Sequence, residues 1–262
     1  MKNQNINVKI SQIRKESGEF FSNIYTDEFK NILDVKETKN TIAVLVQDRD
    51  VKRGYFATGN LEDLIDNIYK WPESTGIDFL SRKGADAVTT YLNKIGFIKY
   101  AVYVKAENNK ISETLSKLES DKFQYQNCRS FISDISEEDA EKIHDFLYES
   151  FNPLTSHIET TVELCKRILR GDIVIHKENG ELTTVLTFDT KLKTLYMEHM
   201  LNKGKSEYMH MLYYYILKKE VEKGTVSVST WIRETNLRAF NFVRRYGLMP
   251  SGLKNFVFCK EK

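Results

Sequence analysis

Two adjacent side chains in one apolar segment can accept protons. Glu198 and His199 lie within the run Thr194 to Leu201, whose composition favours a β-strand. A carboxylate or an imidazole at such a place can act as a general base toward an incoming nucleophile. Successive strand residues face opposite sides, so only one of the two can face a given cleft. The alternative is that both are ordinary edge or surface residues, and both interpretations stay open.

The other residues with metal-binding or nucleophilic chemistry are scattered along the chain. The three cysteines contain no C-x-x-C pair, and their odd number argues against a disulfide framework. The four remaining histidines show no mutual ligand spacing: His144, His157, His176 and His210. We therefore expect no metal site and a reducing, cytoplasmic compartment.

The composition is that of a folded chain with no bias toward a charged partner. The 262 residues are 41% hydrophobic and 12% aromatic, enough for one large or two ordinary domains. With 39 Lys and Arg against 37 Asp and Glu, the net charge of +2 argues against DNA as a partner. No run of residues approaches the roughly 18 apolar positions of a spanning helix, so we expect no membrane partner.

The elements that position these side chains fall into two halves. We expect residues 1–110 to form a smaller α/β domain, residues 111–128 a polar linker, and residues 129–262 a second domain. In the first half, apolar residues at three- and four-residue spacing predict helices between Ile10 and Leu33. Further patterns predict a hairpin of strands at residues 42–46 and 55–57. They also predict helices at 61–69 and 85–95, and strands at 77–80 and 97–105.

The second half predicts the order β-α-α-β-β-β-α-β-α-β. The strands are expected at residues 130–134, 173–177, 182–188, 194–201, 226–232 and 253–259, and the helices at 137–150, 156–169, 206–223 and 237–246. Asn179-Gly180 between two alternating runs is a strong hairpin signal. A hairpin that feeds a strand, a helix and a parallel strand gives a mixed, mostly antiparallel sheet with helices on both faces.

This order resembles the GNAT superfamily of acyl-CoA-dependent N-acyltransferases. The residues KGK at 203–205 stand where the family carries its glycine-rich loop, and Gly224 ends the following helix at the usual distance. Residues 236–240 (NLRAF) resemble the Asn-x-x-Ala helix start of the family, and residues 245–248 (RYGL) its Gly-Phe ending. Residues 91–97 read like a second copy of that ending, which favours a degenerate GNAT-like first domain; a glycine-capped helix before a strand is the alternative.

The resemblance implies acetyl-CoA or another acyl-CoA as the cosubstrate. In the family the pyrophosphate binds backbone N–H groups at a helix N-terminus, and the pantetheine arm pairs with a strand edge. Carried over, the cofactor-binding residues are Met200 and Leu201 on the strand, Lys203, Gly204, Lys205, Ser206 and Glu207 in the loop, and Asn236 near the cofactor arm. Ser206 and Tyr208 occupy the later glycine positions of the loop. Asn236 could equally be only the N-cap of its helix.

The implied activity is transfer of an acyl group, in the first instance acetyl, to an amine of a small-molecule or peptide acceptor. The amine would attack the thioester directly, with Glu198 as the first candidate base and His199 as the second. Val243 stands where many members carry a tyrosine as general acid. Neither the acceptor nor the oligomeric state follows from the sequence.

Two other functions stay open. Tandem-GNAT ligases use aminoacyl-tRNA as the donor, although tRNA binding normally needs a basic surface. A non-catalytic CoA- or partner-binding protein would also fit the missing tyrosine and the substituted loop.

Overall fold

The computed structural model describes residues 3–26, 28–120 and 125–261. The chain divides into two compact units. The first comprises residues 1–103, 153–155 and 253–262, and the second residues 104–152 and 156–252. None of the described helices combines the length and apolar character needed to span a bilayer.

The first unit is built on a mixed sheet in the order β2-β3-β4-β5-β11-β6. Its strands β2 to β4 form antiparallel pairs, β4 and β5 are parallel, and the short β1 pairs with β4. The elements are α1 (Asn3–Glu16), β1 (Phe21–Ser22), β2 (Ile32–Glu37), β3 (Thr41–Asp48), β4 (Val51–Thr58), α2 (Leu61–Ile68), β5 (Thr75–Ser81), α3 (Asp86–Asn93) and β6 (Phe97–Asn108).

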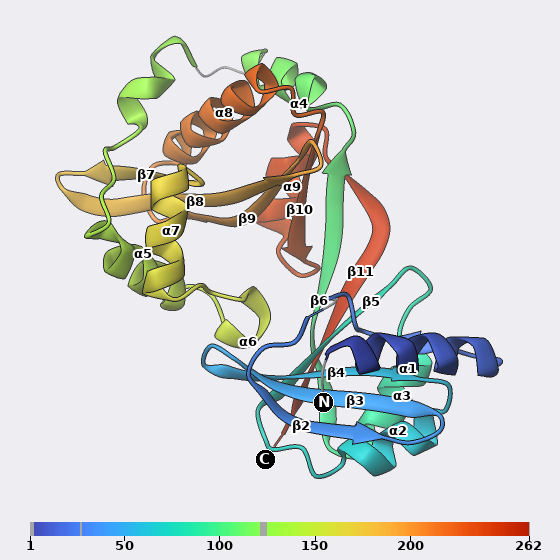
Figure 1. Ribbon diagram of the computed structural model, residues 1–262. Helices are drawn as coiled ribbons and strands as arrows, with labels where there is room; N and C mark the ends of the chain where they lie inside the picture. Colours follow the sequence, from blue (N-terminus) through green and yellow to red (C-terminus); the bar gives the residue numbers. More distant parts are fainter. Residues whose placement is uncertain (1–2, 27, 121–124, 262) are drawn as a thin grey trace. The chain divides into compact units, whose positions relative to one another are not determined.

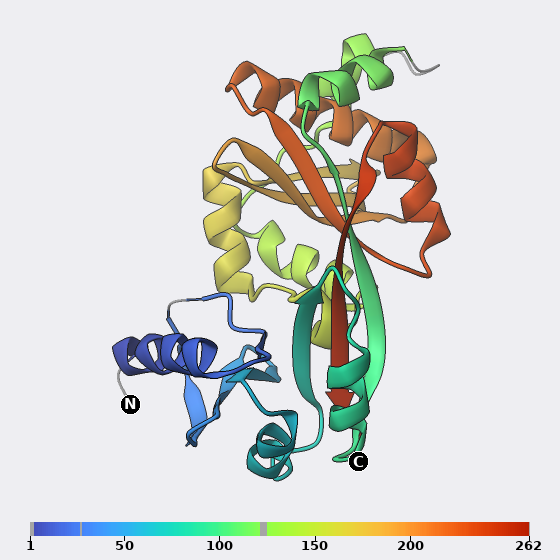
Figure 2. The same ribbon diagram turned by 90° about the vertical axis from the view of Figure 1, so that its right-hand side faces the viewer.

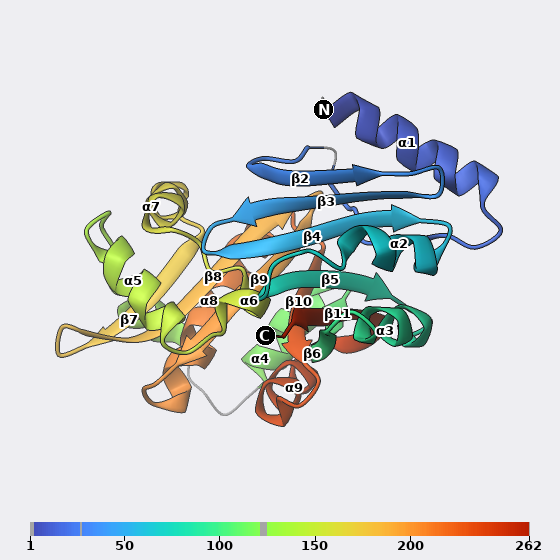
Figure 3. The ribbon, with the colours of Figure 1, turned by 90° about the horizontal axis from the view of Figure 1, so that it is seen from below.

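Alternating side chains of β3 divide the core of the first unit into two layers. Ile42 and Val44 pack with Ile6 and Ile13 of α1 on one face. Ala43 and Leu45 face the other way, and the residues packed there include Leu64 of α2 and Leu92 of α3. Figure 3 shows β2, β3 and β4 side by side, with α1 above these strands and α2 and α3 below them.

A close approach between β4 and Trp71, three residues after the end of α2, gives the first prediction. A Cβ on Gly54 would overlap the indole of Trp71, which is buried. We expect Gly54→Ala to lower the free energy of unfolding by about 2 kcal/mol, because a packed core has no room for an added methyl. Gly18→Ala is the matched control, since an added methyl there would meet nothing within 4 Å. Urea denaturation of both variants measures the difference, and equal stabilities would contradict the packing argument.

The second unit has a mixed sheet in the order β11-β6-β10-β9-β8-β7. Strands β7 to β9 are antiparallel, and β9 and β10 are parallel. The elements are α4 (Ile111–Glu119), the 3-10 helix η1 (Tyr125–Phe131), α5 (Asp139–Tyr148), α7 (Thr161–Arg170), β7 (Ile173–Glu178), β8 (Glu181–Lys191), β9 (Thr194–Asn202), α8 (Ser206–Glu222), β10 (Ser227–Arg233), α9 (Leu237–Arg245) and β11 (Met249–Lys260). The short α6 (Pro153–Ser156) lies between α5 and α7 in the chain.

Helices cover both faces of this sheet. Leu186 and Met197 pack with buried side chains of α8 and α9 on one face. Ile175 and Val185 pack with α5 and α7 on the other. Figures 1 and 2 show the two layers, with α8 and α9 in orange and red and α5 and α7 in green and yellow. The predicted mixed, mostly antiparallel sheet flanked by helices is confirmed.

Three segments differ from their predicted structure. The predicted strand at residues 130–134 is the end of η1 followed by residues outside any helix or strand, where the N–H of Ser133 donates to the carbonyl of Ile175 in β7. The helices predicted between Ile10 and Leu33 stop at Glu16, because the later aromatic residues pack against a sheet. The predicted linker at 111–128 contains α4, whose Ile111 and Leu118 are buried in the core of the second unit, and its residues 121–124 lie outside the described residues.

The two halves of the chain repeat one order of elements. Three antiparallel strands are followed by a helix, a parallel strand, a second helix and a last strand, first as β2-β3-β4-α2-β5-α3-β6 and then as β7-β8-β9-α8-β10-α9-β11. The last strands are exchanged: β5 pairs with β11, and β10 neighbours β6. Both exchanged strands are 12 residues long, and each runs from one unit into the other.

Candidate functional site

A fork opens between the parallel strands β9 and β10 of the second unit. Their pairing runs from Thr194 opposite Ser227 to Met197 opposite Thr230 and ends there, although β9 continues to Asn202 and β10 to Arg233. The opposite edge of β9 pairs with β8 and shifts register at this point. His199 lies opposite Thr187 and Met197 opposite Phe188, so Glu198 is the extra residue of a β-bulge.

The backbone of β9 beyond the bulge presents hydrogen-bonding groups to the fork. The N–H of Lys203 donates to the carbonyl of Thr183 in β8, at 2.8 Å. Backbone groups alternate sides along a strand, so Leu201 also faces β8, whereas Met200 and Asn202 face the fork. Met200 therefore offers one N–H and one C=O on the edge that β10 has left.

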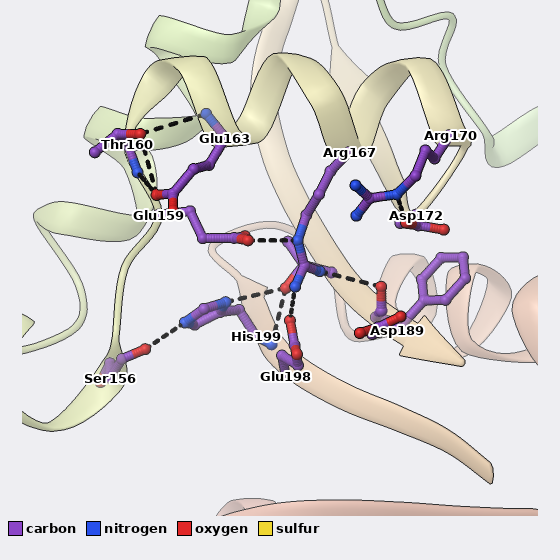
Figure 4. Close-up of polar contacts among 12 residues, drawn as sticks. Ser156, Glu159, Thr160, Glu163, Arg167, Arg170, Asp172, Asp189, Glu198 and His199 are labelled. Atoms are coloured by element: carbon purple, nitrogen blue, oxygen red, sulfur yellow. Dashed lines mark hydrogen bonds and ion pairs between the residues drawn. The ribbon is translucent and has the colours of Figure 1, made fainter. Parts of the chain in front are cut away.

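Glu198 is held by a buried arginine from α7 (Figure 4). Arg167 donates to Glu198 through Nη2, to Glu159 through Nε at 2.6 Å and to the carbonyl of Phe188 through Nη1 at 3.1 Å. Burial lowers the pKa of Arg167, but the two carboxylates outweigh it and raise that pKa. The side chain of Glu198 stays about one third exposed, against 8% for Arg167. The carboxylate at the bulge is thus oriented by an ion pair and open to solvent.

The position of Arg167 follows from the local sequence of α7. Thr160 accepts from the N–H of Glu163, and the Glu163 carboxylate accepts from the N–H of Thr160, a capping box that fixes the start of the helix. Gly171 ends the helix in the left-handed conformation at φ 75°. With both ends set, Arg167 faces the sheet three residues before the helix ends.

His199 is buried with both ring nitrogens bonded. Nδ1 lies 3.0 Å from Oγ1 of Thr187, and Nε2 lies 2.8 Å from the carbonyl oxygen of Ser156. Because a carbonyl only accepts, Nε2 carries the proton of this bond and Nδ1 takes the hydroxyl hydrogen of Thr187. The imidazole ties β9 to β8 and to the chain at Ser156, which leaves neither nitrogen facing a substrate.

Asn202, which the sequence did not single out, organises the loop after β9. Its Oδ1 accepts from the N–H of Gly204 at 3.0 Å and from Oγ1 of Thr184 at 2.9 Å, and its Nδ2 donates to the carbonyl of Lys205 at 3.0 Å. A Cβ on Gly204 would lie 2.9 Å from the ring of Tyr208, so this glycine is required by packing. Gly204 therefore leaves room for the ring of Tyr208, which stands at one of the later glycine positions of the loop.

The loop leads into the N-terminus of α8, where Ser206 and Glu207 form the first turn. Lys205 is the N-cap residue, and its side chain makes no capping hydrogen bond. Lys203 pairs with Glu149 at 3.1 Å and Lys205 with Glu178 at 3.5 Å. Both ammonium groups are substantially exposed, so these pairs are weak and can be exchanged for an anionic ligand.

Asn236, the last predicted cofactor-binding residue, lies at the start of α9. Asn236 caps this helix, because its Oδ1 accepts from the N–H of Ala239 at 3.0 Å. Val243 is buried in the core, and Tyr246 places its hydroxyl 2.7 Å from Nδ1 of His210. Within residues 3–26, 28–120 and 125–261, no group of three or more His, Cys, Asp or Glu residues is arranged to hold a metal ion.

Comparisons with known proteins find a likeness in structure alone. No family model and no curated protein sequence matches the chain. The GCN5-related N-acetyltransferase from Kribbella flavida is similar at a TM-score of 0.53 with 9% identity, covering 100% of this chain and 96% of that one. The corresponding protein from Sphaerobacter thermophilus has a TM-score of 0.52 with 11% identity, covering 85% and 76%.

A third similar structure has no stated activity. It is a functionally unknown conserved protein from Staphylococcus epidermidis, with a TM-score of 0.56, 9% identity, and coverage of 91% of this chain and 98% of that one. The fork, the bulge and the order of elements define an open mixed-sheet fold with a strand edge beside a helix N-terminus. The chain has the fold of the GCN5-related N-acetyltransferases, and the predicted resemblance is confirmed at the level of the fold.

Proposed function

We propose that the second unit transfers an acyl group, in the first instance acetyl, from acyl-CoA to the amine of a small-molecule or peptide acceptor. The observation that carries this proposal is the fork itself. Beyond Met197, β9 no longer pairs with β10, and it leads to a helix N-terminus at which the N-cap residue Lys205 makes no side-chain capping bond. These two features supply the two kinds of hydrogen bond that an acyl-CoA molecule needs.

The residues present fit the two polar parts of the donor. The amides of a pantetheine arm can pair with the N–H and C=O of Met200, as an added strand would. The diphosphate fits the first-turn N–H groups of Ser206 and Glu207, where the helix dipole favours an anion. Lys203 and Lys205 would exchange their exposed glutamate partners for phosphate oxygens.

The chemistry needs a proton acceptor and a group that polarises the thioester carbonyl. The neutral amine attacks the carbonyl carbon and forms a C–N bond. The C–S bond then breaks, and CoA leaves as its thiolate. Backbone N–H groups at the opening of the fork can donate to the carbonyl oxygen as charge develops on it. Glu198, at the bulge beside that point, would take the proton of the amine, directly or through a water.

Of the two base candidates the geometry favours Glu198 over His199. The imidazole has both nitrogens committed to Thr187 and Ser156, whereas the Glu198 carboxylate is partly exposed. Arg167 would act as a positioning residue, because it holds the carboxylate at the fork. His199 is then part of the framework that keeps β9 in register.

Removing one backbone N–H tests the donor site. Proline at position 200 deletes the N–H that faces the fork while leaving the β8 ladder intact, because Met200 does not bond toward β8. We expect Met200→Pro to raise the Kd for acetyl-CoA about tenfold, the cost of one lost hydrogen bond. Isothermal titration calorimetry gives the Kd.

Met200→Ala is the matched control for this test, because it shortens the side chain and keeps the backbone donor. An unchanged Kd in Met200→Pro would place the donor elsewhere. Absence of acetyl-CoA binding in the unaltered protein at millimolar ligand would overturn the proposed function. Binding without transfer to a panel of amines would reduce the function to acyl-CoA binding.

A further inference from the structure

The first unit contains the same fork as the second. Strands β4 and β5 pair in parallel only at Lys52 opposite Thr75 and Arg53 opposite Gly76, and then separate. β4 continues to Thr58 with β3 paired along its whole length. A strand has two edges, so any further partner of β4 must lie on the edge that faces this fork.

Residues 21–23 occupy that edge. Phe21 and Ser22 form β1 and pair with Thr58 and Ala57 of β4. The N–H of Asn23 then donates to the carbonyl of Phe56 at 3.1 Å, and its Oδ1 accepts from the N–H of Phe56 at 2.6 Å. The Nδ2 of Asn23 donates to the carbonyl of Gly54 at 2.9 Å.

Asn23 thus offers Phe56 one amide N–H and one amide carbonyl, the groups that a pantetheine arm would offer. It is only 1% exposed, so the contact is a built part of the unit. The backbone N–H and C=O of Phe56 face the fork of the first unit, as those of Met200 face the fork of the second unit. The hydrogen-bond partners of Phe56, however, belong to Asn23 of the same chain.

The same segment also forms a hydrogen bond with β5, the other strand of the fork. The hydroxyl of Tyr25 accepts from the N–H of Leu80 in β5, at 3.0 Å. Residues 21–25 therefore connect β4 and β5 across the opening between them. A ligand amide would have to displace these bonds from both strands.

The helix that follows β4 is also closed to an anion. Asn60 caps α2 through its Oδ1, which accepts from the N–H of Glu62 at 2.9 Å and of Asp63 at 3.2 Å. Two carboxylates thus stand in the first turn, and the amides that would bind a phosphate already have a partner. At α8, by contrast, the N-cap residue Lys205 makes no side-chain capping bond.

We infer that residues 21–25 are an intramolecular occupant of the donor slot in the first unit, so that each chain binds one acyl-CoA molecule, in the second unit. This inference rests on the proposed function for the position of that one site. The first unit then contributes no donor site of its own, despite repeating the order of elements that forms one.

Titration with acetyl-CoA measures the number of donor sites. We expect one equivalent per chain for the unaltered protein, and no remaining site of unaltered affinity in Met200→Pro. Two equivalents, or one full-affinity site persisting in Met200→Pro, would overturn the inference. Absence of any binding would instead overturn the proposed function, and amide hydrogen exchange would then test whether residues 21–25 occupy the fork.

Amide hydrogen exchange tests the occupant without any donor. The N–H of Phe56 should be protected in the free protein, unchanged by acetyl-CoA, and exchange about tenfold faster in Asn23→Ala. Should that variant fail to fold, Tyr25→Phe keeps the ring and should speed exchange at Leu80 alone. Rapid exchange of the Phe56 amide in the free protein would show that the fork is open. An unchanged exchange rate of the Leu80 amide in Tyr25→Phe would show the same.

Discussion

Arg167→Met is expected to lower the free energy of unfolding by about 3 kcal/mol, because the substitution leaves two carboxylates beside a buried apolar side chain. Glu159 and Glu198 both accept from the guanidinium, which also bonds the carbonyl of Phe188 in β8. One side chain thereby joins α7, β8 and β9. Urea denaturation followed by circular dichroism gives the difference in stability.

Arg170→Met on the same helix is the matched control. Arg170 pairs with Asp172 at 2.6 Å but is more than half exposed, so its loss should cost less than about 0.5 kcal/mol. Adding Glu159→Gln and Glu198→Gln to Arg167→Met should restore much of the lost stability, since no unpaired charge then remains. A stability of Arg167→Met within experimental error of Arg170→Met would show that the buried ion pair does not hold the site.

Glu198→Gln is expected to lower kcat about 100-fold with little change in the Kd for acetyl-CoA. Glutamine keeps the size of the side chain and an oxygen for Arg167, but it cannot take a proton from the amine. The limb of the pH–rate profile that reports the base should disappear in this variant. Steady-state kinetics with a responsive amine acceptor and calorimetry with the donor separate the two quantities.

Glu159→Gln provides the control for this kinetic prediction. It removes the other carboxylate partner of Arg167, before α7 and away from the bulge of β9, so it should keep kcat within about threefold of the unaltered protein. Full turnover by Glu198→Gln would exclude Glu198 as the base. An equal loss in both variants would mean that the arginine network acts only through stability.

The sequence predicted those parts of the fold that depend on local pattern. Asn179-Gly180 identified the β7–β8 hairpin, and both residues adopt positive φ there. The composition of residues 194–201 predicted β9, and the spacing from Asn236 to Gly247 predicted α9. These signals act over a few residues, so one sequence contains them.

The features that were missed depend on distant contacts. The bulge at Glu198 arises from a register shift against β8, and Arg167 lies 31 residues away from the carboxylate it holds. Nothing in the local pattern marked either. Residues 20–25 were predicted to be helical because their aromatic and aliphatic side chains recur at helical spacing. In the structure, Phe21 and Ser22 instead pair with β4 as the strand β1. In α4 the spacing of Ile111, Thr114 and Leu118 was a usable signal that the surrounding charge obscured.

The structure of the chain bound to CoA tests the central proposal most directly. We expect the pantetheine arm along the edge of β9 at Met200, and the diphosphate on the N–H groups of Ser206 and Glu207. Residues 21–25 should still be in place between β4 and β5. CoA bound in the fork of the first unit, or away from both forks, would contradict the proposal.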